Sequence, residues 1–134
     1  MTIVVGYVAT KEGRAALTAA ASEARLRNSR LVVINSNRGG KDLDAEEATR
    51  YEEELAAVKA QLDDAGVEHQ VRQLVRGMEP AEDLIAVAEE VDATLIVIGL
   101  RRRTPVGKLI LGSNAQRILL DAPCPVLAVK AATE

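Results

Sequence analysis

The segment after the apolar run ending at Ile98 contains residue types that bind anions. Gly99 follows this run directly, and Gly112 and Ser113 stand immediately before the next helical pattern. Unpaired backbone amides at the start of a helix bind anions, and glycine lets the backbone approach phosphate oxygens closely. The candidate phosphate site therefore comprises Gly99, Gly112, Ser113 and Asn114, with Ser113 as the expected N-cap. The alternative is structural: a strand end, a turn and a helix cap.

Basic residues in the same segment could assist anion binding. Between Gly99 and Arg117 the sequence has several bases and no acid, although the formal net charge of the chain is −3. Arginine forms paired hydrogen bonds with phosphate, so Arg101 or Arg102 could contact a bound anion. A basic rim around an anionic small molecule is one interpretation, and an ordinary solvated surface is the other. The negative net charge predicts no general attraction to nucleic acid or to an anionic membrane.

Other nucleotide-binding and catalytic motifs are absent from the sequence. Gly107-Lys108 resembles the end of a P-loop, but Leu109 stands where that loop needs Ser or Thr to bind magnesium. No GxGxxG follows the first apolar run, so the dinucleotide fingerprint is missing. We expect His69 to be an exposed surface imidazole and Cys124 to be a buried, unreactive thiol. The sequence thus predicts no metal site and indicates no catalytic group.

Composition excludes several classes of protein. The 134 residues fit a single domain, 1–134, and 48% hydrophobic content is too high for a disordered chain. The aromatic residues are Tyr7 and Tyr51 alone, which argues against the stacking platforms of single-stranded nucleic-acid binders. One cysteine excludes a disulfide framework, and no apolar run approaches the ~20 residues of a membrane span. Because no basic leader precedes the first apolar run, we expect a cytoplasmic protein with no membrane partner.

Short apolar runs alternate with helical patterns along the chain. The expected strands are Thr2–Val8, Leu31–Ser36, Glu68–Val75, Thr94–Ile98 and Pro125–Lys130. The expected helices are Lys11–Asn28, Asp44–Asp64, Glu79–Val91 and a short one from Ser113. Strands that alternate with helices of this length form right-handed crossovers and a parallel sheet with both faces covered. The sequence predicts an α/β fold with a Rossmann-like, doubly wound, five-stranded parallel sheet.

The expected strand order also predicts where a ligand binds. In the order 3-2-1-4-5, neighbouring crossovers diverge to opposite faces of the sheet between the first and fourth strands. Ligands bind at such a point, beyond the carboxyl ends of the strands. The segments that follow these two strands are Tyr7–Thr10 and Gly99–Ser113. The fold therefore brings the candidate phosphate site to the position where a ligand is expected.

The glycine spacing resembles that of the universal stress protein family. The nucleotide motif of that family is Gly, two residues, Gly, nine residues, then Gly-Ser or Gly-Thr; Gly99, the spacing and Gly112-Ser113 match it. The segment 115–129 is similar to the final helix and strand of the family, and Ile3–Leu17 is similar to its first strand and helix. The resemblance covers essentially the whole chain, and its C-terminal third is the specific part.

Two positions depart from the family pattern. Arg102 replaces the second Gly of the motif, and Val8 replaces an Asp that contacts the nucleoside in ATP-binding members. A lost polar contact of this kind costs roughly 1–3 kcal/mol of binding free energy. Arg102 could offset part of that cost by pairing with a phosphate, or its side chain could fill the pocket.

The resemblance implies an adenine nucleotide, ATP or AMP, as the ligand. By carry-over, the glycines, Ser113 and Asn114 hold the phosphates with help from Arg101 or Arg102. Tyr7 and Val8 would flank the nucleoside, and Ser36, at the end of the second strand, would lie near the base. The alternatives are an ordinary strand-end residue for Tyr7 and a turn residue for Ser36. The implied binding residues are Tyr7, Val8, Ser36, Gly99, Arg101, Arg102, Gly112, Ser113 and Asn114.

The last strand predicts a homodimer. The stretch Val126–Val129 is apolar and carries no central charge, so an uncovered edge there would be prone to aggregate. Pairing with a second copy would cover it, and many universal stress proteins dimerise through this strand. The leading hypothesis is a dimeric stress-response protein that binds a regulatory adenine nucleotide. The alternatives are a protein-interaction module that binds no nucleotide and a slow ATP hydrolase or phosphoryl-transfer enzyme.

Overall fold

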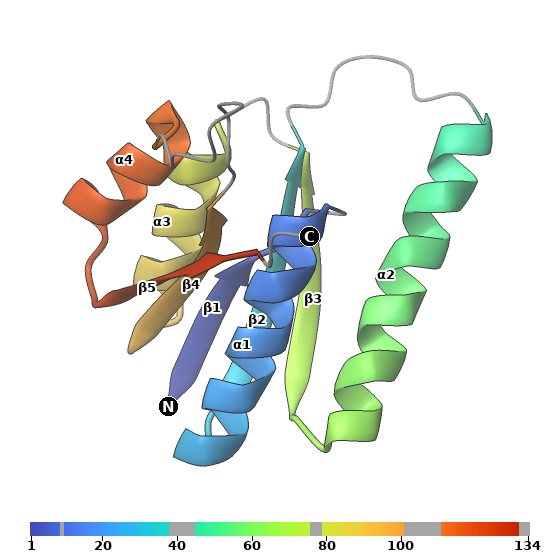
Figure 1. Ribbon diagram of the computed structural model, residues 1–134, viewed down its shortest axis with the longest axis horizontal. Helices are drawn as coiled ribbons and strands as arrows, with labels where there is room; N and C mark the ends of the chain where they lie inside the picture. Colours follow the sequence, from blue (N-terminus) through green and yellow to red (C-terminus); the bar gives the residue numbers. More distant parts are fainter. Residues whose placement is uncertain (9, 38–44, 76–78, 101–110, 132–134) are drawn as a thin grey trace.

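The computed structural model describes residues 1–8, 10–37, 45–75, 79–100 and 111–131, which form one parallel sheet with helices on both faces (Figure 1). The five strands lie in the order β3-β2-β1-β4-β5. The strands are β1 Thr2–Gly6, β2 Arg30–Asn37, β3 His69–Val75, β4 Leu95–Leu100 and β5 Val126–Lys130. The helices are α1 Lys11–Arg27, α2 Ala45–Ala65, α3 Pro80–Glu90 and α4 Ser113–Asp121. The predicted fold class and strand order are confirmed.

The carboxyl ends of β1 and β4 each differ by two residues from the expected bounds, and the other bounds differ by at most one. β1 ends at Gly6 rather than Val8, because the chain then turns: the Thr10 N–H donates to the Val8 carbonyl at 2.8 Å and α1 begins. β4 continues to Leu100 rather than ending at Ile98, because β5 extends the pairing with Gly99 opposite Val129. Gly99 therefore lies within a strand, at its carboxyl end.

The central strand is buried on both faces. Ile3, Val4 and Val5 pair with β2 on one side and with β4 on the other, and all three are 0% exposed. Their side chains alternate: Ile3 and Val5 pack toward α1 and α2, whereas Val4 packs toward α3 and α4. A continuous β-branched run is typical of a parallel strand with both faces covered. This alternation fixes which face each residue after β1 can reach.

Small residues let α1 lie close to the sheet. Its buried face consists mainly of alanines, with Ala16, Ala20 and Ala24 at most 1% exposed. Two glycines allow a closer contact at its first turn. A Cβ at Gly13 would lie 1.8 Å from the Val8 carbonyl oxygen, and one at Gly99 would lie 2.2 Å from that of Glu12.

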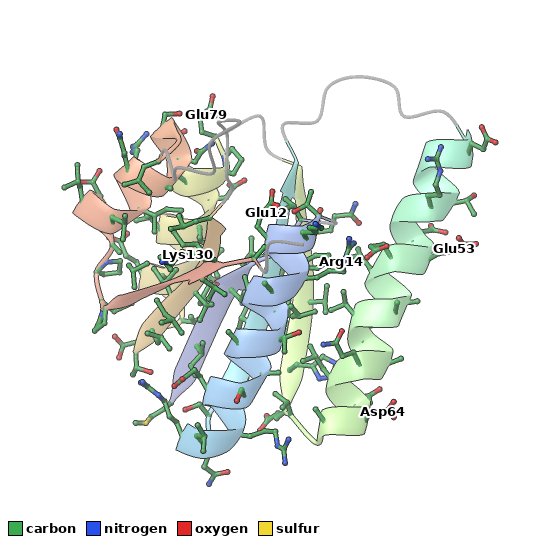
Figure 2. The ribbon with its side chains drawn as sticks, viewed as in Figure 1. Glu12, Arg14, Glu53, Asp64, Glu79 and Lys130 are labelled. Carbon is green, nitrogen blue, oxygen red and sulfur yellow. The ribbon has the colours of Figure 1, made fainter. Side chains whose placement is uncertain are left out.

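One hydrogen bond links the end of β1 to α2. The Tyr7 side chain is 2% exposed, and its hydroxyl donates to Glu54 Oε2 at 2.5 Å. Burial raises the pKa of Tyr7 well above its usual range, and the hydrogen bond to the Glu54 carboxylate raises it further. On the opposite side of α2, the acidic side chains of Glu53 and Asp64 point away from the sheet (Figure 2).

Within the described residues, no helix is long and apolar enough to cross a membrane.

We expect Gly13→Ala to lower the free energy of unfolding by about 1–3 kcal/mol, because the new methyl group would force α1 away from the Val8 backbone. Urea unfolding followed by circular dichroism measures this change. Thr18→Ala, at an exposed position of the same helix, is the control and should change stability by less than about 0.5 kcal/mol. A Gly13→Ala protein as stable as the wild type would contradict the close contact.

We expect Tyr7→Phe to cost about 1 kcal/mol near neutral pH, because the Glu54 carboxylate loses its donor. The difference should depend on pH. In the unfolded chain Tyr7 releases its proton near pH 10, whereas its raised pKa keeps it protonated in the folded state. The stability that Tyr7 contributes is therefore fully present below about pH 10 and is lost above it. Urea unfolding from pH 8 to 11 should show a steeper decline for the wild type, and parallel curves would contradict this assignment.

Candidate functional site

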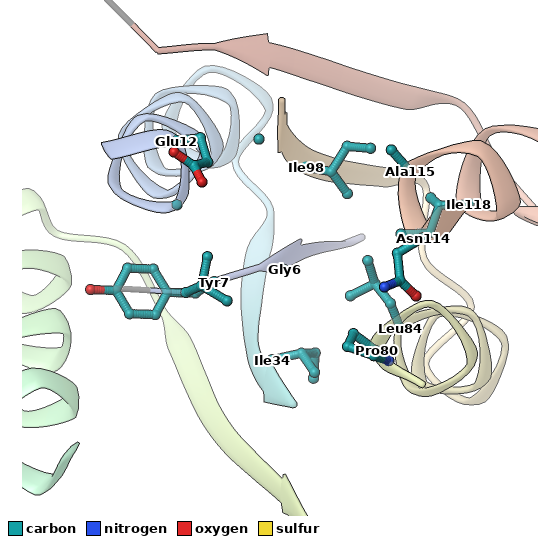
Figure 3. A pocket seen from close by; sticks show the side chains of 13 residues that line it. Gly6, Tyr7, Glu12, Ile34, Pro80, Leu84, Ile98, Asn114, Ala115 and Ile118 are labelled. Carbon is teal, nitrogen blue, oxygen red and sulfur yellow. The ribbon is translucent and has the colours of Figure 1, made fainter. Parts of the chain in front are cut away.

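A pocket of about 160 Å³ opens at the carboxyl ends of β1 and β4 (Figure 3). Its lining comes from the end of β1 and the segment after it, the first turn of α1, β2, β4, α3 and α4. The lining residues are Gly6, Tyr7, Val8, Glu12, Gly13, Ile34, Pro80, Leu84, Ile98, Gly99, Asn114, Ala115 and Ile118. The expected strand order predicts a ligand between β1 and β4, at the switch point where the crossovers diverge to opposite faces of the sheet. The described residues form a pocket there.

The pocket wall on the α3 and α4 side is aliphatic. Ile34, Leu84, Ile98 and Ile118 belong to one buried cluster and are each at most 5% exposed. Gly6 adds room, because a Cβ there would lie 3.3 Å from a methyl group of Leu84. Among the side chains that the structure describes, no aromatic one belongs to this cluster. Such a wall suits a flat apolar group packed between methyl groups, and not one stacked on an aromatic ring.

Tyr7 borders the pocket, but its ring points away from it, toward α2 (Figure 3). It continues the alternation of Ile3 and Val5, and so packs in the α1 and α2 cluster on the other face of the sheet. Its backbone holds the end of β1 in place. The Tyr7 N–H donates to the Ile34 carbonyl at 2.9 Å, and Asn35 Nδ2 donates to the Tyr7 carbonyl at 3.1 Å.

Val8 is 48% exposed and lies beside the pocket. Its side chain presents methyl groups to solvent next to the first turn of α1. An apolar side chain at this point offers no hydrogen bond to a polar ligand.

The N-terminus of α4 differs from the expectation for Ser113. Gly112 is the N-cap: its backbone is extended, and its carbonyl accepts from the Gln116 N–H at 3.0 Å. Ser113 is the first helical residue, so the predicted cap was one residue too late. The first amides of a helix have no acceptor within the helix, and the positive end of the dipole lies there. The N-terminal turn of α4 can therefore attract an anion at the pocket.

Two of the predicted phosphate-binding residues also hold the fold together. Asn114 Oδ1 accepts from the Ala81 N–H at 3.0 Å, so a side chain of α4 caps the first turn of α3. Gly99 makes room for the backbone of Glu12. These packing roles explain both residue types without a ligand. Asn114 nevertheless lines the pocket, next to Ala115 (Figure 3).

Three predicted binding residues, Ser36, Arg101 and Arg102, have side chains outside the described part of the structure. Ser36 lies at the end of β2, opposite Leu74 of β3, and its side chain falls outside the described part of the structure. Arg101 and Arg102 lie outside the described residues. Their roles stay predictions.

Glu12 is the pocket residue that the sequence did not indicate. It stands in the first turn of α1 and is the charged residue of the described lining. The helical pattern of α1 shows which face is apolar, but it does not show that the first turn meets β4. The indirect signal was the pair of glycines, Gly13 and Gly99, that permits this contact.

His69 and Cys124 lie away from the pocket lining. His69 is not the exposed imidazole that we expected: its side chain is 13% exposed, and Nδ1 lies 2.8 Å from the Val67 carbonyl oxygen. Cys124 is half-buried, and burial raises the pKa of its thiol, which disfavours the nucleophilic thiolate. The described residues contain no group of His, Cys, Asp and Glu side chains that could hold a metal ion.

Comparison with known proteins identifies the family. The universal stress protein family profile matches residues 1–130. A universal stress protein of Mycolicibacterium smegmatis is 48% identical over 128 residues, which cover 96% of each chain. One from Thermus aquaticus is 33% identical over 96% of this chain and 98% of its own.

Solved structures agree with the sequence matches. A universal stress protein from Archaeoglobus fulgidus superposes with a TM-score of 0.83 at 40% identity, over 97% of this chain and 98% of its own. A second structure from that organism, a complex with dAMP, superposes with a TM-score of 0.78 at 35% identity over the same shares. The glycine spacing, the strand order and the match over residues 1–130 agree, and this chain belongs to the universal stress protein family.

Proposed function

We propose that this protein is a cytoplasmic stress-response protein that binds an adenine nucleotide, of the ATP or AMP type, as a regulatory ligand. The observation that carries the proposal is the pocket at the switch point, which joins an aliphatic wall to the N-terminal turn of α4. The relative from Archaeoglobus fulgidus that is 35% identical binds dAMP, which supports an adenine nucleotide here.

The two ends of the pocket suit the two ends of a nucleotide. The base lies against Ile34, Leu84 and Ile98, and the phosphate meets the amides of Ser113 and Asn114 at the start of α4. Gly112 precedes these amides without a side chain to obstruct the approach. The pocket of about 160 Å³ is smaller than the ~300–1,000 Å³ of typical small-molecule sites, so it takes the base and sugar while the phosphates extend outward.

A regulatory role suits the site better than catalysis. Among the described lining residues, Glu12 is the charged side chain, and no histidine or cysteine accompanies it. Transfer of a phosphoryl group to water depends on a bound metal ion and on a group that positions or deprotonates the attacking water. Arg101 and Arg102 would supply positive charge for binding, but they neither accept a proton nor hold a metal.

We also propose that the protein forms a homodimer through β5. This strand pairs with β4 on one side and forms the edge of the sheet, and Val126 to Val129 are all only half-buried. The Ile96 N–H donates to the Pro125 carbonyl at 3.0 Å. In a parallel ladder the amides of Leu127 and Val129 then face β4, and those of Val126 and Ala128 face outward. A second copy could pair with these outward groups.

We expect Ala115→Leu to weaken AMP and ATP binding at least about tenfold, because the larger side chain fills the space beside the aliphatic wall. Isothermal titration calorimetry measures the affinities. Gln116→Leu is the matched control: the same side chain at the next, exposed position should leave binding within about twofold. Unchanged binding by Ala115→Leu would reject this pocket as the site. No binding to the wild type at millimolar nucleotide would favour the protein-interaction module.

We expect Ala128→Pro to convert the dimer to a monomer, because proline removes an outward N–H without removing a bond to β4. Sedimentation equilibrium measures the molar mass. Gln73→Pro is the matched control, since the Leu31 N–H bond to the Glu68 carbonyl places the Gln73 N–H outward on the opposite edge strand. A dimer that survives Ala128→Pro, or a wild-type monomer, would contradict pairing through β5.

A further inference from the structure

The position of Glu12 is fixed by the backbone around it. It lies in the first turn of α1, where the Thr10 side chain accepts from the Gly13 N–H at 3.1 Å and the Arg14 N–H donates to the Thr10 carbonyl at 2.9 Å. A Cβ on Gly99 would lie 3.1 Å from the Cβ of Glu12. The base of the Glu12 side chain is therefore held against the carboxyl end of β4, at the rim of the pocket.

Glu12 lies across the pocket from Asn114 and from the aliphatic side chains (Figure 3). Figure 2 shows it on the turn of α1 that faces the carboxyl ends of the strands. The pocket thus has three chemically different sides: an aliphatic wall, the positive end of the α4 dipole, and a carboxylate on α1.

These three sides constrain how a nucleotide can lie. A carboxylate only accepts hydrogen bonds, so the part of the ligand beside Glu12 must carry donors. It repels phosphate, which the α4 N-terminus attracts instead. The base occupies the aliphatic wall. The remaining part of a nucleotide is the sugar, which connects base to phosphate and carries hydroxyl donors.

We infer that Glu12 binds the sugar hydroxyls of the nucleotide and makes the pocket selective for a nucleoside whose sugar carries hydroxyl groups. The inference rests on the proposed nucleotide binding. A carboxylate offers about four acceptor positions, so Glu12 can accept from a ligand while it keeps a protein contact. Hydrogen bonds to a charged acceptor are shorter and roughly twice as strong as those between neutral groups.

The experiment compares two ligands on each protein: AMP, and 2′,3′-dideoxy-AMP, which lacks both sugar hydroxyls. The measured quantity is the ratio of their dissociation constants by isothermal titration calorimetry. For the wild type we expect AMP to bind about 10- to 100-fold more tightly than the dideoxy compound. In Glu12→Ala this ratio should fall to about 1, through weaker AMP binding alone, since the dideoxy compound never used the carboxylate.

Two variants separate this role from a structural one. Glu12→Gln keeps an oxygen acceptor without the charge, so its ratio should lie between those of the wild type and Glu12→Ala. Glu23→Gln makes the same chemical change about three turns along α1, where Glu23 pairs with Arg27, and should keep the wild-type ratio. Unchanged affinity for the dideoxy compound in Glu12→Ala shows that the pocket remains folded.

The outcomes distinguish the two proposals. A wild type that binds both ligands equally, or a Glu12→Ala protein that keeps the full ratio, overturns the role of Glu12 while nucleotide binding stands. A wild type that binds neither ligand at millimolar concentration overturns nucleotide binding, and the role of Glu12 falls with it. A ratio that collapses in Glu12→Ala and survives in Glu23→Gln supports the inference.

Discussion

At the carboxyl end of the sheet, the first turn of α1 lies directly against the backbone of β4 and of the segment after β1. Any side chain at Gly13 or Gly99 would meet a carbonyl oxygen at about 2 Å, well inside van der Waals contact. The contact places Val8 and Glu12 beside the end of β4. Without it, α1 would stand away from the sheet and the pocket would lose one of its sides. The shape of the pocket therefore depends on how closely the backbone of α1 approaches the backbones of β4 and of Val8.

The alternation of side chains along β1 decides what the pocket can contain. Residues 3, 5 and 7 face α1 and α2, and residues 4 and 6 face α3 and α4. Tyr7, one of two aromatic residues in the chain, is committed to the opposite face, where its hydroxyl bonds Glu54. On the α3 and α4 face β1 contributes Gly6, and the described pocket wall there consists of aliphatic side chains. A base bound there packs against methyl groups, and its orientation must come from polar groups at the rim.

Much of the fold could be predicted because both faces of the sheet are buried. The run at Ile3–Val5 and the spacing of strands and helices were enough for the sheet type, and the strand order assumed for such a sheet, 3-2-1-4-5, is the one observed. Local details depended on single hydrogen bonds that no pattern encodes. Gly112 rather than Ser113 caps α4 because its carbonyl accepts the first helical bond, and His69 is largely buried beside the Val67 carbonyl. Glu12 was not predicted as a pocket residue, because Gly99, the residue of β4 that it lies against, is 87 positions away in the sequence.

The family motif and the binding of a ligand are separable in this chain. Gly99 is required by the backbone of Glu12, and Asn114 is required by the first turn of α3. A chain that had lost nucleotide binding would still need both residues to fold, so their presence does not discriminate between the proposed functions. The discriminating groups are those that the packing does not require. The Glu12 carboxylate at the rim and the small side chain of Ala115 line the pocket, and neither takes part in the close approach of α1 to β4 or in the cap of α3. Evidence for the ligand must therefore come from positions where the fold would tolerate a change and binding would not.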